Sequence, residues 1–196
     1  MASKEKKSAW GKLRSYFGGS AEAEKKVAVE EGVAEDAQET KHLVITGELR
    51  DRVAGAAKQY AKQLHEAGDI PTEEMRVVGY RDLLSEYVGQ SITKLHDKLD
   101  SVKGGILFIE EPYRLTDFND WGDEVVEELW RVMAKEDADP VIVLGGRADK
   151  IQEFLQTYPE DMKPLALNHI SLKGAGVAAD PRKKYKNGTT GSTGPK

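Results

Sequence analysis

Short apolar runs alternate with helical patterns through the middle of the chain. The runs have four to six residues and lack polar alternation, which is typical of strands buried on both faces of a sheet. They lie at 42–46, 75–80, 105–109, 141–145 and 169–172. Between them, apolar positions recur at helical spacing over 52–67, 91–102, 123–135 and 148–157.

This alternation predicts a three-layer α/β fold. A strand that is followed by a helix and then by another strand of the same sheet forms a right-handed crossover, which makes neighbouring strands parallel. We therefore expect a five-stranded, mostly parallel sheet over 41–172. In open sheets of this kind, ligands bind beyond the carboxyl ends of the strands.

Three segments outside this pattern differ from it in composition. Residues 1–19 are basic, residues 20–40 are acidic without aromatics, and residues 173–196 are basic and rich in Gly, Lys and Thr. The acidic segment lacks the apolar surface that would offset the entropy of ordering, so we expect a flexible linker there. The C-terminal segment predicts a flexible tail.

The basic N-terminal segment has an amphipathic pattern. Trp10, Leu13 and Phe17 fall on one face of a short helix and are surrounded by lysine and arginine. This pattern suits a helix that docks on a membrane surface or a partner, a mitochondrial presequence, or a disordered basic arm.

Bulk composition narrows the function classes further. The chain has 196 residues, no cysteine and a net charge of −5. It therefore lacks disulfides and thiolate metal sites, and an intracellular, cytoplasmic location is expected, with mitochondrial targeting left open. Because the part between the basic ends is acidic, we expect no sequence-specific nucleic-acid binding.

Four sequence blocks resemble one family in their order and spacing. They are "HLVITG" from His42, "YRDLLSEYVGQS" from Tyr80, "GGILFIEEPYRL" from Gly104 and "PVIVLGGRAD" from Pro140. Together they resemble the P-loop AAA+ ATPases, and most closely the group of red-type Rubisco activase, stage V sporulation protein K and the type VII secretion ATPase. The resemblance implies a P-loop NTPase-like domain that works on protein partners.

The first block departs from the phosphate-binding loop of that family. Such a loop reads G-x-x-x-x-G-K-[ST], so that backbone N–H groups and a lysine bind phosphate while a hydroxyl holds magnesium. Counted from Gly47, the last three determinants fall on Arg52, Val53 and Ala54. We expect no nucleotide cofactor there, and we expect Asp51 to cap the following helix.

The third block retains carboxylates where the family organises magnesium and polarises water. These positions hold Glu110 and Glu111. Without the loop lysine and hydroxyl, we expect no metal at Glu110, and Glu111 is a vestigial catalytic candidate. The segment 158–170, which resembles the arginine-finger segment, contains no arginine, and no helical pattern of a lid domain follows Leu172.

One feature of the resemblance points to protein contact. Tyr87, Val88 and Gly89 fall where the family has an aromatic pore loop, which grips polypeptide through apolar contact while glycine lets the loop move. A loop with a partly buried tyrosine is the alternative.

These patterns lead to three hypotheses. The favoured one is a pseudo-ATPase that is not an enzyme and that serves as an interaction module or scaffold for an active AAA+ relative or for itself. The second is an ATPase with a rewired loop, in which Arg50, Arg52 and Glu111 act. The third is an adaptor that docks through residues 1–19.

Overall fold

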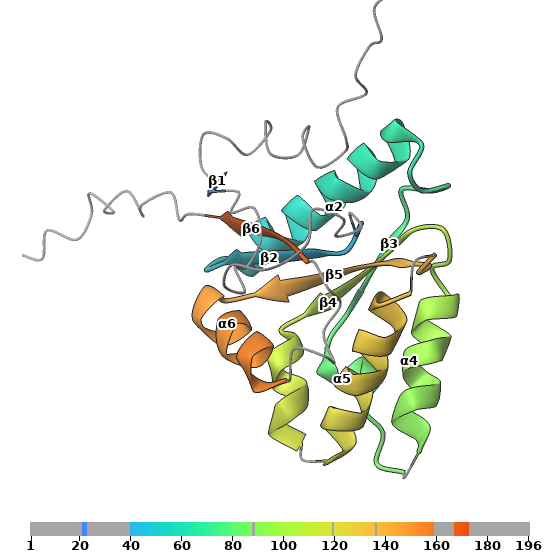
Figure 1. Cartoon of the computed structure of the whole chain (residues 1–196), viewed down its shortest axis with the longest axis vertical. Coiled ribbons are helices and arrows are strands. Elements are labelled where there is room, and N and C mark those ends of the chain that lie inside the picture. The colour runs from blue at the N-terminus through green and yellow to red at the C-terminus, as the bar shows by residue number, and fades with distance from the viewer. Residues whose placement is uncertain are drawn as a thin grey trace, which may run out of the picture.

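Strands and helices alternate along the chain in the computed structural model and form three layers (Figure 1). The structure describes residues 21–22, 40–87, 89–118, 120–135, 137–158 and 167–172. The elements, in order, are β1 Ala21–Glu22, β2 Leu43–Gly47, α2 Arg50–Ala67, β3 Met75–Val78, α3 Tyr80–Leu83, α4 Gln90–Asp100, β4 Ile106–Glu110, the 3-10 helix η1 Pro112–Phe118, α5 Asp120–Met133, β5 Val141–Gly146, α6 Ala148–Thr157 and β6 Asn168–Leu172.

The sheet has the strand order β1-β6-β2-β5-β4-β3. The five predicted strands, β2 to β6, pair in parallel, so the predicted fold class is confirmed. The two-residue strand β1 pairs antiparallel with β6. It comes from the segment predicted as a linker. Its sequence gave no signal because so short a strand needs only backbone pairing and no apolar run.

Helices cover both faces of the sheet. Figure 1 shows α2 on one face and α4, α5 and α6 on the other. The sequence of β2 is continuously apolar because successive side chains of a strand point to opposite faces, and helices cover both faces of this sheet. Leu43 and Ile45 pack into the core beneath α2. Val44 packs into the core beneath the three other helices.

The sequence pattern did not predict the shortest helices. Helix α3 has four residues and η1 has seven, which is too short for a 3.6-residue period to stand out. Helix α2 begins at Arg50, two residues before the predicted start. The predictions for Trp10, Leu13 and Phe17, for most of the linker and for the tail concern segments outside the described residues, and they stay predictions.

Candidate functional site

The carboxyl ends of β2, β5 and β4 lie side by side in the sheet, and they form the edge at which ligands bind in folds of this kind. Two connections leave this edge. One joins β2 to α2, and the other joins β4 to η1 and α5. The residues predicted to handle phosphate and metal lie in these two connections.

The connection from β2 to α2 is very short. Only Glu48 and Leu49 separate strand from helix. The amides of Arg52 and Val53 both donate to the Leu49 carbonyl, at 3.1 and 3.1 Å, so helical hydrogen bonding begins at once. A phosphate loop instead needs non-helical backbone whose N–H groups turn toward the anion.

The residue before the helix is also not the predicted one. Leu49 occupies the N-cap position in an extended conformation and makes no side-chain capping hydrogen bond. Asp51 lies inside the first helical turn, so the prediction that it caps the helix is wrong. The prediction failed because α2 starts earlier than its apolar pattern indicates.

The residues of the predicted loop pack inward. Val53, at the lysine position, is 2 % exposed and belongs to the core beneath α2. A Cβ added to Gly145 of β5 would lie 2.8 Å from Val53 Cγ1, so helix and strand approach closely here. Ala54 packs partly against the same core, and Arg52 is half-buried.

An ion pair joins the two connections. The Arg50 Nε atom donates to Glu110 Oε1 at 3.2 Å, and the Arg50 Nη2 atom also contacts Glu110 Oε2. The Arg50 side chain is 64 % exposed and that of Glu110 is 22 % exposed. The hydrogen bond to Glu110 raises the pKa of the Arg50 guanidinium above its ordinary value.

This pair spans the strand between its two elements, because β5 separates β2 from β4 in the sheet. From the sequence, we placed Arg50 in a rewired loop and Glu110 at the family's magnesium position, and we did not predict a contact between them. Sixty residues separate them, and only the strand order brings them together. The only signs of this contact in the sequence were a basic residue shortly after one predicted strand and an acidic residue directly after another.

Glu111 has an unusual backbone and a well-oriented side chain. Its φ of 51° lies in the left-handed region, which non-glycine residues seldom adopt. Its N–H donates to the Gly145 carbonyl at 2.7 Å. Its carboxylate accepts hydrogen bonds from Tyr113 Oη at 2.9 Å and Arg114 Nη1 at 3.5 Å. Burial, followed by the hydrogen bond to Glu111, raises the pKa of Tyr113 to about 12.

Arg114 links this carboxylate to helix α3. Its guanidinium carbon lies 5.1 Å from the centre of the Tyr80 ring, and that of Arg81 lies 5.5 Å from the same ring. Cations over aromatic rings are attracted by the ring quadrupole. Glu111 is therefore connected through Arg114 and Tyr80 to the start of the block in which a pore loop was predicted.

The residues of that predicted loop are exposed where the structure describes them. Tyr87 is 70 % exposed, so the alternative of a partly buried tyrosine does not hold. Gly89 has a φ of 75° and precedes α4, a conformation that favours glycine. Val88 lies outside the described residues. Contact of this segment with a polypeptide stays a prediction.

Neither a metal-binding cluster nor a membrane-spanning helix occurs among the described residues. No group of three or more His, Asp or Glu side chains there is placed to hold a metal ion. Likewise, no helix in the described ranges has the length and apolar character needed to cross a membrane.

Curated proteins of one group match the chain. CbbX of Cereibacter sphaeroides is 32 % identical over 136 residues, which cover 68 % of this chain and 44 % of that protein. The chromosomal CbxX of Cupriavidus necator is 31 % identical over 134 residues, with 67 % and 42 % covered. The chain is a homologue of these proteins. The chloroplastic ribulose bisphosphate carboxylase/oxygenase activase of Cyanidioschyzon merolae is 31 % identical over 134 residues, with 67 % and 45 % covered.

These matches confirm the resemblance to the Rubisco activase group of the AAA+ ATPase superfamily. No family model matches the chain. The chain spans less than half the length of the curated relatives named above. The expected absence of a lid stays a prediction. One relative is chloroplastic, and the predicted cytoplasmic location stays a prediction.

The relatives also correct one prediction. We predicted that the chain is not an enzyme, and this is wrong because its homologues are ATPases. The prediction assumed that a loop with Arg52, Val53 and Ala54 at the positions of the usual phosphate-binding residues has lost ATP hydrolysis.

Proposed function

We propose that the chain works as a protein remodeller of the Rubisco activase type, with a phosphate site rewired around Arg50. Its similarity to CbbX, CbxX and a Rubisco activase supports the activity class. The ion pair of Arg50 and Glu110 at the ligand edge of the sheet is the observation that carries the rewired site. The proposal concerns the part of the activity that this α/β domain supplies.

The residues at this edge fit a phosphate group in two respects. Arg50 offers a planar, largely exposed guanidinium, which matches phosphate oxygens. The N-terminus of the 18-residue helix α2 follows the end of β2 at the same edge, and no side-chain cap occupies its N–H groups. Arg52 adds positive charge to the same turn. A phosphate bound here would replace Glu110 as the partner of Arg50.

Glu111 would supply the general base. Bound nucleotide would contribute the phosphoryl group that water attacks. The Glu111 carboxylate, held by Tyr113 and Arg114, is oriented to accept the proton of that water.

Nucleotide affinity and turnover of four proteins test this proposal. Arg50→Ala should weaken ATP binding about tenfold or more, because it removes the charged donor. Glu111→Gln should leave affinity nearly unchanged and reduce hydrolysis about 100-fold. Arg131→Ala is the matched control, because Arg131 is similarly exposed and pairs with Glu128 on α5. Absence of binding and turnover in the unaltered chain, with and without protein partners, would contradict the proposal.

A further variant separates the two glutamates. In Glu110→Gln, the carboxylate that competes for Arg50 is removed, so nucleotide affinity should rise several-fold. A fall in affinity would show that Glu110 itself contributes to nucleotide binding and that the assigned roles are incorrect.

The short connection between β2 and α2 favours a second role, that of a subunit that pairs with an active AAA+ relative or with another copy of the chain. Such pairing would let a neighbouring subunit's loop handle phosphate while this chain contributes Arg50 and its protein-binding surfaces. Size-exclusion chromatography with and without CbbX, together with the ATPase rate of CbbX, tests it. Unchanged elution and an unchanged rate would exclude pairing with that relative.

A further inference from the structure

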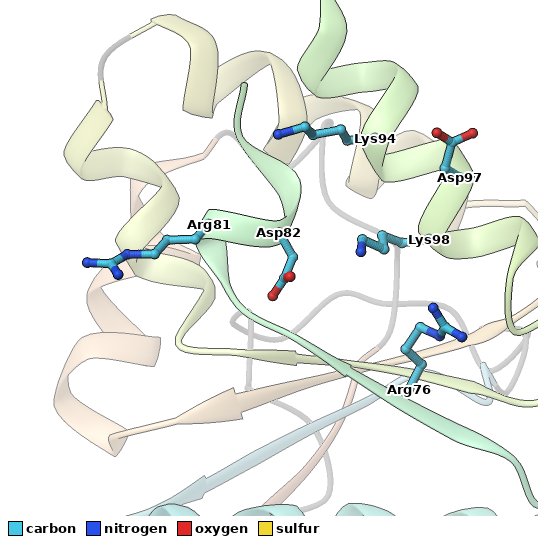
Figure 2. A pocket seen from close by; sticks show the side chains of 6 residues that line it. All are labelled: Arg76, Arg81, Asp82, Lys94, Asp97 and Lys98. Carbon is cyan, nitrogen blue, oxygen red and sulfur yellow. The ribbon is translucent and has the colours of Figure 1, made fainter. Parts of the chain in front are cut away.

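A basic hollow lies at the end of the sheet away from β1, between β3, α3 and α4 (Figure 2). Its volume is about 430 Å³. Four cationic and two acidic side chains line it, namely Arg76, Arg81, Lys94, Lys98, Asp82 and Asp97. None of these residues belongs to the proposed phosphate site at Arg50.

The chain geometry directs two of these cations into the hollow. Val78 packs into the core beneath α4, and Arg76 shares its face because it lies two residues earlier on the strand. Figure 2 shows Arg76 and Lys98 extending into the space between β3 and α4, with Asp82 on the α3 side and Arg81 pointing away. Lys94 lies one helical turn before Lys98.

The walls of the hollow are held by hydrogen bonds to backbone. Lys94 Nζ donates to the Leu84 carbonyl at 2.6 Å, which ties α4 to the segment after α3. Asp82 Oδ2 accepts from the Gly79 N–H at 2.9 Å. By contrast, none of the ion pairs found in the described ranges involves Arg76 or Lys98. Arg76 is exposed and Lys98 is half-buried.

Strand β3 also offers an open edge. It is the last strand of the sheet as described, so one side of it has no strand neighbour. Val77, on the other face of the strand, is 46 % exposed. Unpaired strand edges accept extended peptides, which add main-chain hydrogen bonds and place alternate side chains on each face. On the α4 face, those side chains would meet Arg76 and Lys98.

We propose that the β3 edge binds an extended acidic segment of a protein partner, whose carboxylates contact Arg76 and Lys98. Charge complementarity favours an acidic segment, because Arg76 and Lys98 form no ion pair with a carboxylate within the described part of the chain. Nucleic acid fits less well, since Asp82 and Asp97 line the same hollow and would repel a continuous phosphate backbone. The proposal does not depend on nucleotide binding at Arg50.

Fluorescence anisotropy with a labelled decamer of alternating Glu and Thr tests this site on the full chain. A Gln-Thr decamer is the neutral control. Arg76→Ala and Lys98→Ala should each weaken binding of the Glu-Thr decamer about threefold, and together about tenfold or more. Lys58→Ala and Lys62→Ala remove the same charge from α2, on the opposite face of the sheet, and should change nothing.

Several results would overturn the proposal. They are equal binding by the double variant and the unaltered chain, equal losses in the α2 variants, equal affinity for the Gln-Thr decamer, tighter binding of an oligothymidine, and displacement of the decamer by inorganic phosphate. A double variant with Arg76→Lys and Lys98→Arg keeps both charges and should retain binding. Circular dichroism of every variant confirms that the fold is intact, and the charge-keeping variant provides the test if an alanine variant fails to fold.

Discussion

The two connections at the carboxyl edge of the sheet are built in opposite ways. After β2, two residues lead directly into a helix whose Val53 side chain packs into the core. After β4, Glu110 and Glu111 extend from the strand end, and a 3-10 helix follows them. The helical turn after the first connection packs into the core through Val53, whereas the second connection presents two carboxylates.

The difference shows that the backbone between strand and helix decides which connection can carry chemistry. A two-residue turn leaves no room for a loop of N–H groups around an anion, so a phosphate bound there would meet only Arg50 and the N-terminus of α2. Glu111 is held in a left-handed conformation with two donors on its carboxylate, and such strain is typical of functional sites. Arg50 is the exception in the first connection, because it reaches across to the second.

The largest expected effect comes from restoring lysine in the first connection. Val53→Lys places a cation in the core beneath α2, where Val53 packs among apolar side chains. The free energy of unfolding should fall by about 3 kcal/mol or more, because an unpaired charge is buried. Urea denaturation monitored by circular dichroism measures this loss.

Gly55→Lys is the matched control for that substitution. Gly55 lies two residues further along α2, is exposed, and an added Cβ there would meet no atom within 4 Å. This variant should be as stable as the unaltered chain or more stable by up to about 1 kcal/mol, because lysine favours helix over glycine. Full stability of Val53→Lys together with tighter ATP binding would show that the first connection still reaches the ligand edge.

Local pattern was enough to predict the layers of this fold. Runs such as Leu107–Ile109 are apolar at every position, and the stripe of Val125, Val126 and Leu129 repeats at helical spacing. Both patterns arise because buried positions are occupied by apolar residues, which can be read from the sequence directly. The strand order could not be read in the same way, since it depends on pairings between distant segments.

The candidate site was harder to predict for the same reason. The pair of Arg50 and Glu110 exists only because β2 and β4 flank β5. The basic hollow needs Arg76 of the edge strand to face Lys98 of α4, although the spacing of Lys94 and Lys98 was visible. The sequence motif pointed to the carboxyl edge of the sheet but did not indicate which side chains meet there.

A smaller effect concerns the uncapped N-terminus of α2, at the end of the first connection. Leu49 occupies the N-cap position with φ −103° and ψ 115°, and its side chain makes no cap. It is 60 % exposed, so its loss should cost little. Leu49→Ser should raise the free energy of unfolding by about 1 kcal/mol, because the hydroxyl can accept a hydrogen bond from the first turn. Leu49→Ala lacks that acceptor, and equal stability of the two variants would contradict the assigned cap.

The smallest effect probes the second connection through Tyr113. Its pKa of about 12 in the folded chain lies above the ordinary value of 10.0, so folding favours the neutral phenol. The resulting stability is fully present below pH 10 and is lost as pH rises through about 12. Glu111→Gln removes the charge beside the phenol, so the pKa should fall, yet burial is the larger cause and should keep it above the ordinary value.

Tyrosinate absorbance during an alkaline titration measures this shift, and Tyr113→Phe assigns the signal. Tyr158 is the internal reference, because burial and its hydrogen bond to Asp123 raise its pKa independently of Glu111. An unchanged Tyr113 titration in Glu111→Gln would mean that the carboxylate does not contact the phenol in solution. The second connection would then lack the oriented carboxylate that distinguishes it from the first, and Glu111 would lose its support as a general base.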